Sequence, residues 1–149
     1  LAIRQTPAKE VEPRIADIAK RLNISDILDK YPYQVSGGQK QRCACARAII
    51  HNPKLLLADE PTGALDSHSS QLFLSTIQSI HEQLHATILM VTHDPFTASY
   101  SNRILFLRDG EIFTELHRGS DSRDVFFQKI LNVLTIMGGG KSHVCETDL

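Results

Sequence analysis

The chain lacks the excess of charge that would point to a polyanionic partner. Its 149 residues carry 16 Lys and Arg against 17 Asp and Glu, a formal net charge of -1 at pH 7, and the basic residues are scattered. A surface that binds nucleic acid or anionic lipid needs a concentrated positive field. We therefore expect no nucleic-acid partner.

Long apolar stretches are also missing. No apolar run approaches the roughly 20 residues of a membrane-spanning helix, and no signal peptide opens the sequence. Any membrane association is therefore expected to come through a partner protein.

Cysteine is scarce and poorly spaced. Cys43, Cys45 and Cys145 are odd in number and do not form a disulfide framework. On a helix, the thiols of Cys43 and Cys45 would point about 200° apart, so they cannot chelate one metal ion. We expect both thiols to pack in the protein, in a reducing cytoplasm.

The apolar residues alternate between helical and strand periods. Recurrence at three or four positions predicts amphipathic helices over residues 11–22, 73–84 and 126–137. Continuous apolar runs at residues 55–58 and 87–91 indicate strands of a parallel sheet, the first buried on both faces. This alternation favours an α/β architecture.

Caps and turn residues predict the connecting elements. Pro13 stands near the start of the first helix, where a missing N–H has little effect. Ser25 is expected to cap a short helix over residues 26–30, and residues 39–50 are expected to form a helix rich in Ala and Arg. Asp109-Gly110 suits the type I′ turn of a hairpin.

Two adjacent acids, Asp59 and Glu60, follow the first predicted strand. Ligands of open α/β sheets collect at the carboxyl ends of strands. Asp59 can hold Mg²⁺, usually through water, and Glu60 can accept a hydrogen bond from the water that attacks a γ-phosphate. On its own, such a pair more often forms a solvated loop tip.

The segment Ser36-Gly37-Gly38 opens the helix over residues 39–50. Its glycines permit close approach of the backbone to a phosphate, and a helix N terminus offers unpaired N–H groups with a partial positive charge. Ser36 adds a hydroxyl donor. The alternative is a turn that only caps the helix.

His93 follows the second predicted strand, so we expect it to converge with Glu60 on one edge of the sheet. A neutral imidazole there can contact a γ-phosphate and orient the attacking water. The alternative is an ordinary loop histidine beside Asp94-Pro95, which is also how we interpret the other six histidines.

The order and spacing of three motifs resemble the ABC ATPase family. S-G-G-Q-K-Q-R resembles its signature, L-L-L-A-D-E-P-T-G-A-L-D its Walker B and D-loop, and V-T-H-D its switch histidine. The resemblance implies an α/β fold, a partial P-loop NTPase (ABC ATPase) core with part of the helical signature subdomain. It divides the chain into a helical part (1–45), a core (46–119) and a C-terminal helix with a tail (120–149).

The resemblance also implies roles for individual residues. The nucleotide-binding residues would be Ser36, Gly37, Gly38, Gln39 and Asp59, the first four acting on ATP held by the opposite subunit. The catalytic residues would be Glu60, as general base, and His93. The D-loop that links the two ATP sites of a dimer would be Ala64, Leu65 and Asp66. ATP and Mg²⁺ would be the cofactors, with Mg²⁺ on the side of Asp59.

A Walker A loop, G-x-x-x-x-G-K-[ST], is not found. Gly140-Lys141-Ser142 follows a helical pattern and has Thr135 where the first glycine belongs, so we do not interpret it as a phosphate loop. In the family, Walker A and the Q-loop precede the helical subdomain. We therefore expect a C-terminal part of an ATPase that alone neither binds ATP tightly nor hydrolyses it.

Two classes of ABC protein compete at this point. Ribosome-acting members usually carry Asn-His where this chain has Gly63-Ala64, and DNA-repair members have long coiled coils, which are absent here. The segment S-R-D-V-F-F-Q-K-I-L-N-V-L-T-I-M-G-G-G is similar to ATPases of bacitracin-type antimicrobial-peptide exporters. This favours an ATPase subunit that energises export of such a substrate, over a soluble ABC protein acting on ribosomes or DNA or a non-catalytic fragment.

The transporter interpretation carries expectations about partners. They are an ABC permease in the membrane and a second ATPase domain, in a homodimer or a pair. The protein would lie on the cytoplasmic face of the cell membrane, held there through the permease.

Overall fold

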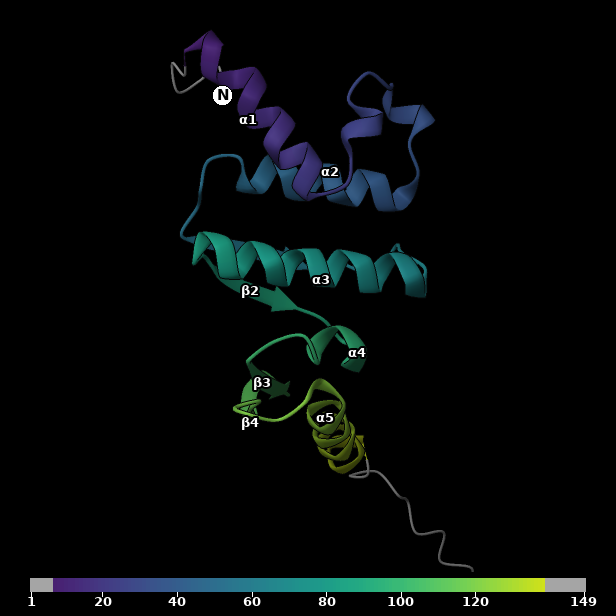
Figure 1. Cartoon of the computed structure of the whole chain (residues 1–149). Helices are drawn as coiled ribbons and strands as arrows, with labels where there is room; N and C mark the ends of the chain where they lie inside the picture. Colours follow the sequence, from purple (N-terminus) through teal and green to yellow (C-terminus); the bar gives the residue numbers. More distant parts are fainter. Residues whose placement is uncertain (1–6, 139–149) are drawn as a thin grey trace, which may run out of the picture. The chain divides into compact units, whose positions relative to one another are not determined.

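The structure, a computed structural model, describes residues 7–138. Its elements along the chain (Figure 1) are α1 (Ala8–Arg21), η2 (Ser25–Ile27), η3 (Pro32–Gln34), α2 (Gly37–Ile49), β1 (Leu55–Asp59), α3 (Ser67–Leu84), β2 (Thr87–Val91), α4 (Pro95–Ala98), β3 (Arg103–Arg108), β4 (Glu111–His117) and α5 (Arg123–Gly138). The chain divides into two compact units, with the boundary between Thr92 and His93. The three-part division expected from the sequence stays a prediction.

Helices α1, α2 and α3 share the apolar core of the first unit. The buried members of this core are Ile18, Ala19, Leu22, Ile24, Ile27, Ile49 and Ile80. Of the predicted apolar stripe of α1, only the C-terminal half is buried. Ile18 and Leu22 belong to the core, whereas Ile15 is 36% exposed. The position expected for Pro13 was wrong: α1 begins at Ala8, so Pro13 lies inside the helix and removes one internal hydrogen bond.

The segment between α1 and α2 differs from the predicted capped helix. The N-cap residue of η2 is Ile24, and Ser25 makes no capping bond, because the Ile27 N–H donates to the Ile24 carbonyl and draws Ser25 into a 3₁₀ turn. A further 3₁₀ turn, η3, starts at Pro32. Its fixed φ and missing N–H suit the first position of such a turn.

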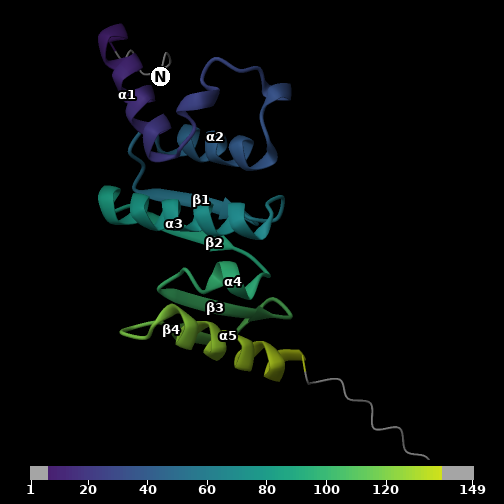
Figure 2. The same ribbon diagram turned by 45° about the vertical axis from the view of Figure 1, so that its right-hand side comes forward.

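Strands β1 and β2 pair in parallel, as predicted, with Leu55 opposite Thr87 and Asp59 opposite Val91. The expectation that β1 is buried on both faces was wrong, since the Leu57 side chain is 72% exposed. The opposite face carries Leu56, which packs against the apolar core of the first unit. Figure 2 shows α3 running alongside both strands. Within the described residues, helices therefore cover one face of this sheet.

The second unit contains the predicted hairpin of β3 and β4, which pair in antiparallel fashion. Asp109 and Gly110 have φ angles of 53° and 84°, and a type I′ turn needs positive values at both positions. Phe126 and Ile130 of α5 bury against Phe106 of β3, so the predicted final helix is confirmed. Among the helices of residues 7–138, none has both the length and the apolar content that crossing a bilayer demands.

Candidate functional site

Ser36 starts helix α2 through a reciprocal pair of hydrogen bonds. Its Oγ accepts from the Gln39 N–H at 3.3 Å, and its own N–H donates to Gln39 Oε1 at 2.9 Å. This capping box fixes both residues at the helix N terminus. The Ser36 hydroxyl serves here as an acceptor, so its proton is still able to donate to a phosphate. The segment therefore caps the helix, as the alternative interpretation stated. Capping is compatible with phosphate binding, which stays a prediction.

The glycines of this loop lie against the segment predicted to be the D-loop. A Cβ atom added to Gly37 would be 3.5 Å from the Ala64 carbonyl oxygen, and one added to Gly38 would be 3.6 Å from Leu65 Cδ2. Two sets of predicted site residues, far apart in the sequence, are therefore neighbours in the first unit. A Cβ atom at either glycine would make ordinary van der Waals contacts there, so the two loops lie side by side without a steric requirement for glycine.

Asp66, the last of the predicted D-loop residues, is the N-cap of α3. Its carboxylate accepts from the Ser69 N–H at 2.9 Å and from the Ser69 hydroxyl at 2.8 Å. These hydrogen bonds hold the pKa of the Asp66 carboxyl below its ordinary value. The residue therefore has a local structural role whatever it contacts in a dimer.

Asp59 and Glu60 have different environments although they are adjacent. Asp59 is the exposed last residue of β1, and Glu60 is half-buried with a left-handed φ of 41°. The Glu60 N–H donates to the Val91 carbonyl at 2.9 Å, and the Glu60 carbonyl accepts from the Gly63 N–H at 3.1 Å. A glutamate in this conformation is strained, and the bonds on either side hold it there.

Thr92 is a site residue to which the sequence motifs assigned no role. Its hydroxyl donates to Glu60 Oε2 at 3.1 Å. The parallel register sets Asp59 opposite Val91, so the next residue of each strand leaves the sheet at the same edge. The sequence does show a hydroxyl residue directly after β2. To predict its hydrogen bond with Glu60, however, the register of β1 against β2 must be known.

His93 begins the second unit, so its predicted convergence with Glu60 stays a prediction. The next residue, Asp94, caps α4: its carboxylate accepts from the Phe96 N–H at 3.1 Å, the Thr97 N–H at 3.0 Å and the Thr97 hydroxyl at 2.6 Å. Partial burial alone would raise the pKa of Asp94, but the hydrogen bonds from Thr97 and Phe96, with the nearby His93, hold it below its ordinary value.

Asp59 fits the chemistry of a magnesium site. Within residues 7–138, no three His, Cys, Asp or Glu side chains gather as a ligand set for a metal ion. Mg²⁺ does not need one, since it keeps several waters and is bound by one or two carboxylates together with substrate phosphates. A single exposed carboxylate at a strand end can supply the protein's share.

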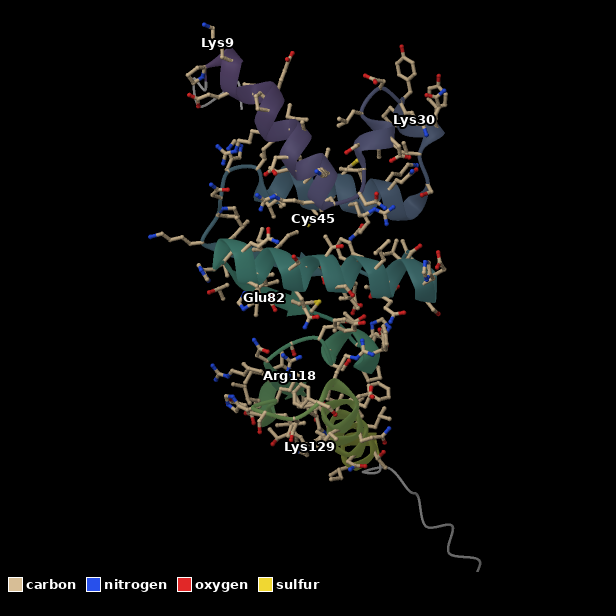
Figure 3. The ribbon with its side chains drawn as sticks, in the orientation of Figure 1. Lys9, Lys30, Cys45, Glu82, Arg118 and Lys129 are labelled. Atoms are coloured by element: carbon tan, nitrogen blue, oxygen red, sulfur yellow. The ribbon has the colours of Figure 1, made fainter. Side chains whose placement is uncertain are left out.

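The two described cysteines differ from each other. Cys45, labelled in Figure 3, packs against the helical core, and burial raises the pKa of its thiol to about 11. Cys43 is exposed, so the expectation that both thiols pack was wrong for this one. Residues two positions apart on a helix point to nearly opposite sides. When Cys45 faces the core, Cys43 therefore faces away from it.

The Gly140-Lys141-Ser142 segment and Cys145 lie outside the described residues. Thr135 lies inside α5, in agreement with the helical pattern expected before that segment.

Comparison with known proteins gives consistent matches. The family model for ABC transporters matches residues 2–63. The bacitracin export ATP-binding protein BceA of Halalkalibacterium halodurans is 49% identical over 139 residues, 93% of this chain and 55% of that protein. The uncharacterized ABC transporter ATP-binding protein YvcR of Bacillus subtilis is 52% identical over 139 residues, 93% of this chain and 53% of its own length. The chain thus spans about half the length of these relatives.

A solved structure supports the same fold. The dimeric structure of a post-hydrolysis state of the ATP-binding cassette MJ0796, bound to ADP and Pi, aligns with a TM-score of 0.66 at 35% identity, over 75% of this chain and 49% of that one. The predicted fold class, a partial P-loop NTPase core with part of a helical signature subdomain, is therefore confirmed.

Proposed function

Because the chain belongs to the family of ABC transporter ATP-binding proteins, we propose that it is the C-terminal part of an ATPase subunit that energises export. The observation that carries the proposal is the arrangement at the end of β1, where Glu60 has a strained backbone and its carboxylate accepts from Thr92 at 3.1 Å. Strained residues held by their surroundings are concentrated at functional sites.

In this proposal Glu60 is the general base of ATP hydrolysis. Its carboxylate accepts the proton of the attacking water, and Thr92 fixes the direction of that carboxylate. Asp59 would hold Mg²⁺ through water, and the ion would neutralise charge on the phosphates. His93 would contact the γ-phosphate and orient the water.

A second ATPase domain would complete each site. The α2 N terminus, with Ser36 and the glycines after it, would approach the γ-phosphate of ATP held by the opposite subunit. The proximity of these glycines to Ala64-Leu65 supports this, because the D-loop and the signature loop would then move together. The dimeric cassette MJ0796 bound to ADP and Pi is a precedent.

The transported substrate is proposed to be an antimicrobial peptide such as bacitracin, since a relative at 49% identity is a bacitracin export protein. The chain would act with a membrane permease, peripherally, at the cytoplasmic face of the cell membrane. A soluble ABC protein acting on ribosomes or DNA is not favoured, because the relatives are ABC transporter ATP-binding proteins.

The test of catalysis is Glu60→Gln in the full-length protein reconstituted with its permease. ATP binding and dimerisation should remain, and hydrolysis should fall by roughly 10²–10⁴-fold, the range for loss of a general base. The matched control is Glu82→Gln, because Glu82 is an exposed acid on α3 (Figure 3). Unchanged turnover in Glu60→Gln would refute the proposed role.

Two further measurements address the proposed assembly. We expect the isolated 149-residue chain neither to bind labelled ATP tightly nor to hydrolyse it; micromolar binding with turnover that depends on Glu60 would contradict this. Affinity purification of the full-length protein should recover a permease. Recovery of ribosomes instead would support the soluble alternative.

A further inference from the structure

The first residue of α5 contacts the segment that follows His93. The Arg123 guanidinium donates a hydrogen bond from Nη1 to the Tyr100 hydroxyl. Its Cζ atom also lies 4.8 Å from the centre of the Tyr100 ring and 5.6 Å from that of Phe96. The two rings pack edge to face with centres 5.5 Å apart. One cation therefore engages both aromatic side chains.

Helix α4, which contains Phe96 and ends two residues before Tyr100, cannot be stable by itself. It has 4 residues, and isolated helices shorter than roughly 12 residues are marginal in water. The carboxylate of Asp94 caps its start, and Ala98 packs on the core of the second unit. Arg123 adds a third contact, with the rings of Phe96 and Tyr100.

The position of Arg123 in α5 favours a role in this contact. It is the first residue of the helix, where the partial positive charge of the helix dipole opposes a cation. An acidic or neutral residue would suit that position better for helix stability alone. Contact with Phe96 and Tyr100 offsets this unfavourable location.

We propose that Arg123 is a positioning residue for His93: it holds α4 against α5 and thereby fixes the backbone at Asp94, directly after the histidine. The inference rests on the proposed ATPase function. A misplacement of about 1 Å in a reacting group can lower a rate by as much as 10²-fold. Loosening α4 should therefore slow hydrolysis while leaving nucleotide binding intact.

Hydrogen exchange tests, without ATP, whether Arg123 stabilises α4. In the full-length protein, Arg123→Ala should speed amide exchange across residues 93–100 by about tenfold, equivalent to about 1.4 kcal/mol of local stability. Arg103→Ala is the matched control, because Arg103 pairs with Glu115 on the hairpin of the same unit. Unchanged exchange in Arg123→Ala, or equal acceleration in both variants, would overturn the proposal.

Steady-state ATP hydrolysis then separates positioning from plain stability. Arg123→Ala should lower kcat about five- to tenfold with KM unchanged, a ΔΔG‡ within the ordinary range for a positioning group. Arg123→Lys keeps the charge but not the planar fork, so it should recover only part of kcat. Faster exchange with wild-type kcat would overturn the positioning role and leave Arg123 a structural residue.

The same measurements distinguish failure of this inference from failure of the proposed function. If Glu60→Gln hydrolysed ATP normally while Arg123→Ala still lowered kcat, the assignment of Glu60 would fail and the role of Arg123 would stand. If Glu60→Gln abolished turnover and Arg123→Ala did not change it, the reverse would hold.

Discussion

Replacing Thr92 with valine removes one hydroxyl group and leaves the shape of the side chain nearly unchanged. That hydroxyl donates to Glu60 Oε2 at 3.1 Å in a part-buried position. A hydrogen bond to a charged group contributes about 1.5–3 kcal/mol, and water can replace part of it at a site open to solvent. We take the lower end, which corresponds to a fall in kcat of about tenfold for Thr92→Val.

The assay is ATP hydrolysis by the full-length protein with the proposed permease, together with nucleotide affinity measured by titration. Thr92→Val should lower kcat and leave the affinity for ATP unchanged, because in the proposed mechanism the hydroxyl orients Glu60, the proposed base, rather than the nucleotide. Thr92→Ser, which keeps the hydroxyl, should retain most of the activity. The effect should be smaller than that of Glu60→Gln, which removes the proposed base itself.

Two results would refute this reasoning. A kcat for Thr92→Val within about twofold of wild type would show that the hydroxyl does not orient Glu60. A Thr92→Ser protein as slow as Thr92→Val would show that the hydroxyl and its hydrogen bond are not sufficient to orient Glu60.

The remaining predictions concern stability and reactivity. Leu22→Ala should destabilise the protein by about 2–5 kcal/mol in urea denaturation, because Leu22 is fully buried, whereas Leu28→Ala, at a residue 49% exposed, should change the midpoint little. Asp94 has a lowered pKa, so its stabilising effect is present above its ordinary value of 3.8 and is lost as pH falls through its folded-state value. Asp94→Asn keeps a capping side chain and should flatten this acid dependence of the melting temperature; an unaltered pH profile would contradict the assignment. Iodoacetamide at pH 8 should alkylate Cys43 and spare Cys45, whose partly buried thiol has a pKa raised to about 11. Equal labelling of the native protein would be inconsistent with burial.

Local patterns predicted the elements that local forces determine. Strand β2 was expected at Thr87–Val91 and lies there, because Thr87, Ile88 and Val91 are β-branched and favour the extended backbone of a strand. The hairpin turn followed from Asp109-Gly110, since both residue types tolerate positive φ.

Features that depend on distant neighbours were not accessible from the sequence in the same way. The exposure of Leu57 depends on what packs on the second face of the sheet, and no residue of β1 carries that information. Likewise, the bond between Thr92 and Glu60 exists because two strands far apart in the chain pair in one particular register. Similarly, the exposure of Cys43 can be predicted only if it is known which face of α2 packs against the core.

The backbone of Glu60 is the strongest sign that the end of β1 was selected for function rather than for stability. The other non-glycine residues with positive φ in the described part of the chain are Asn23, Asn52, His85 and Asp109. All four are types that enter the left-handed region comparatively readily, and they lie at turns or helix ends. Glutamate has no such tendency, and replacement by glycine would relieve the strain. The strained glutamate, bonded through its backbone to Val91 and Gly63 and through its carboxylate to Thr92, is therefore better explained by a need for a carboxylate at that point than by folding.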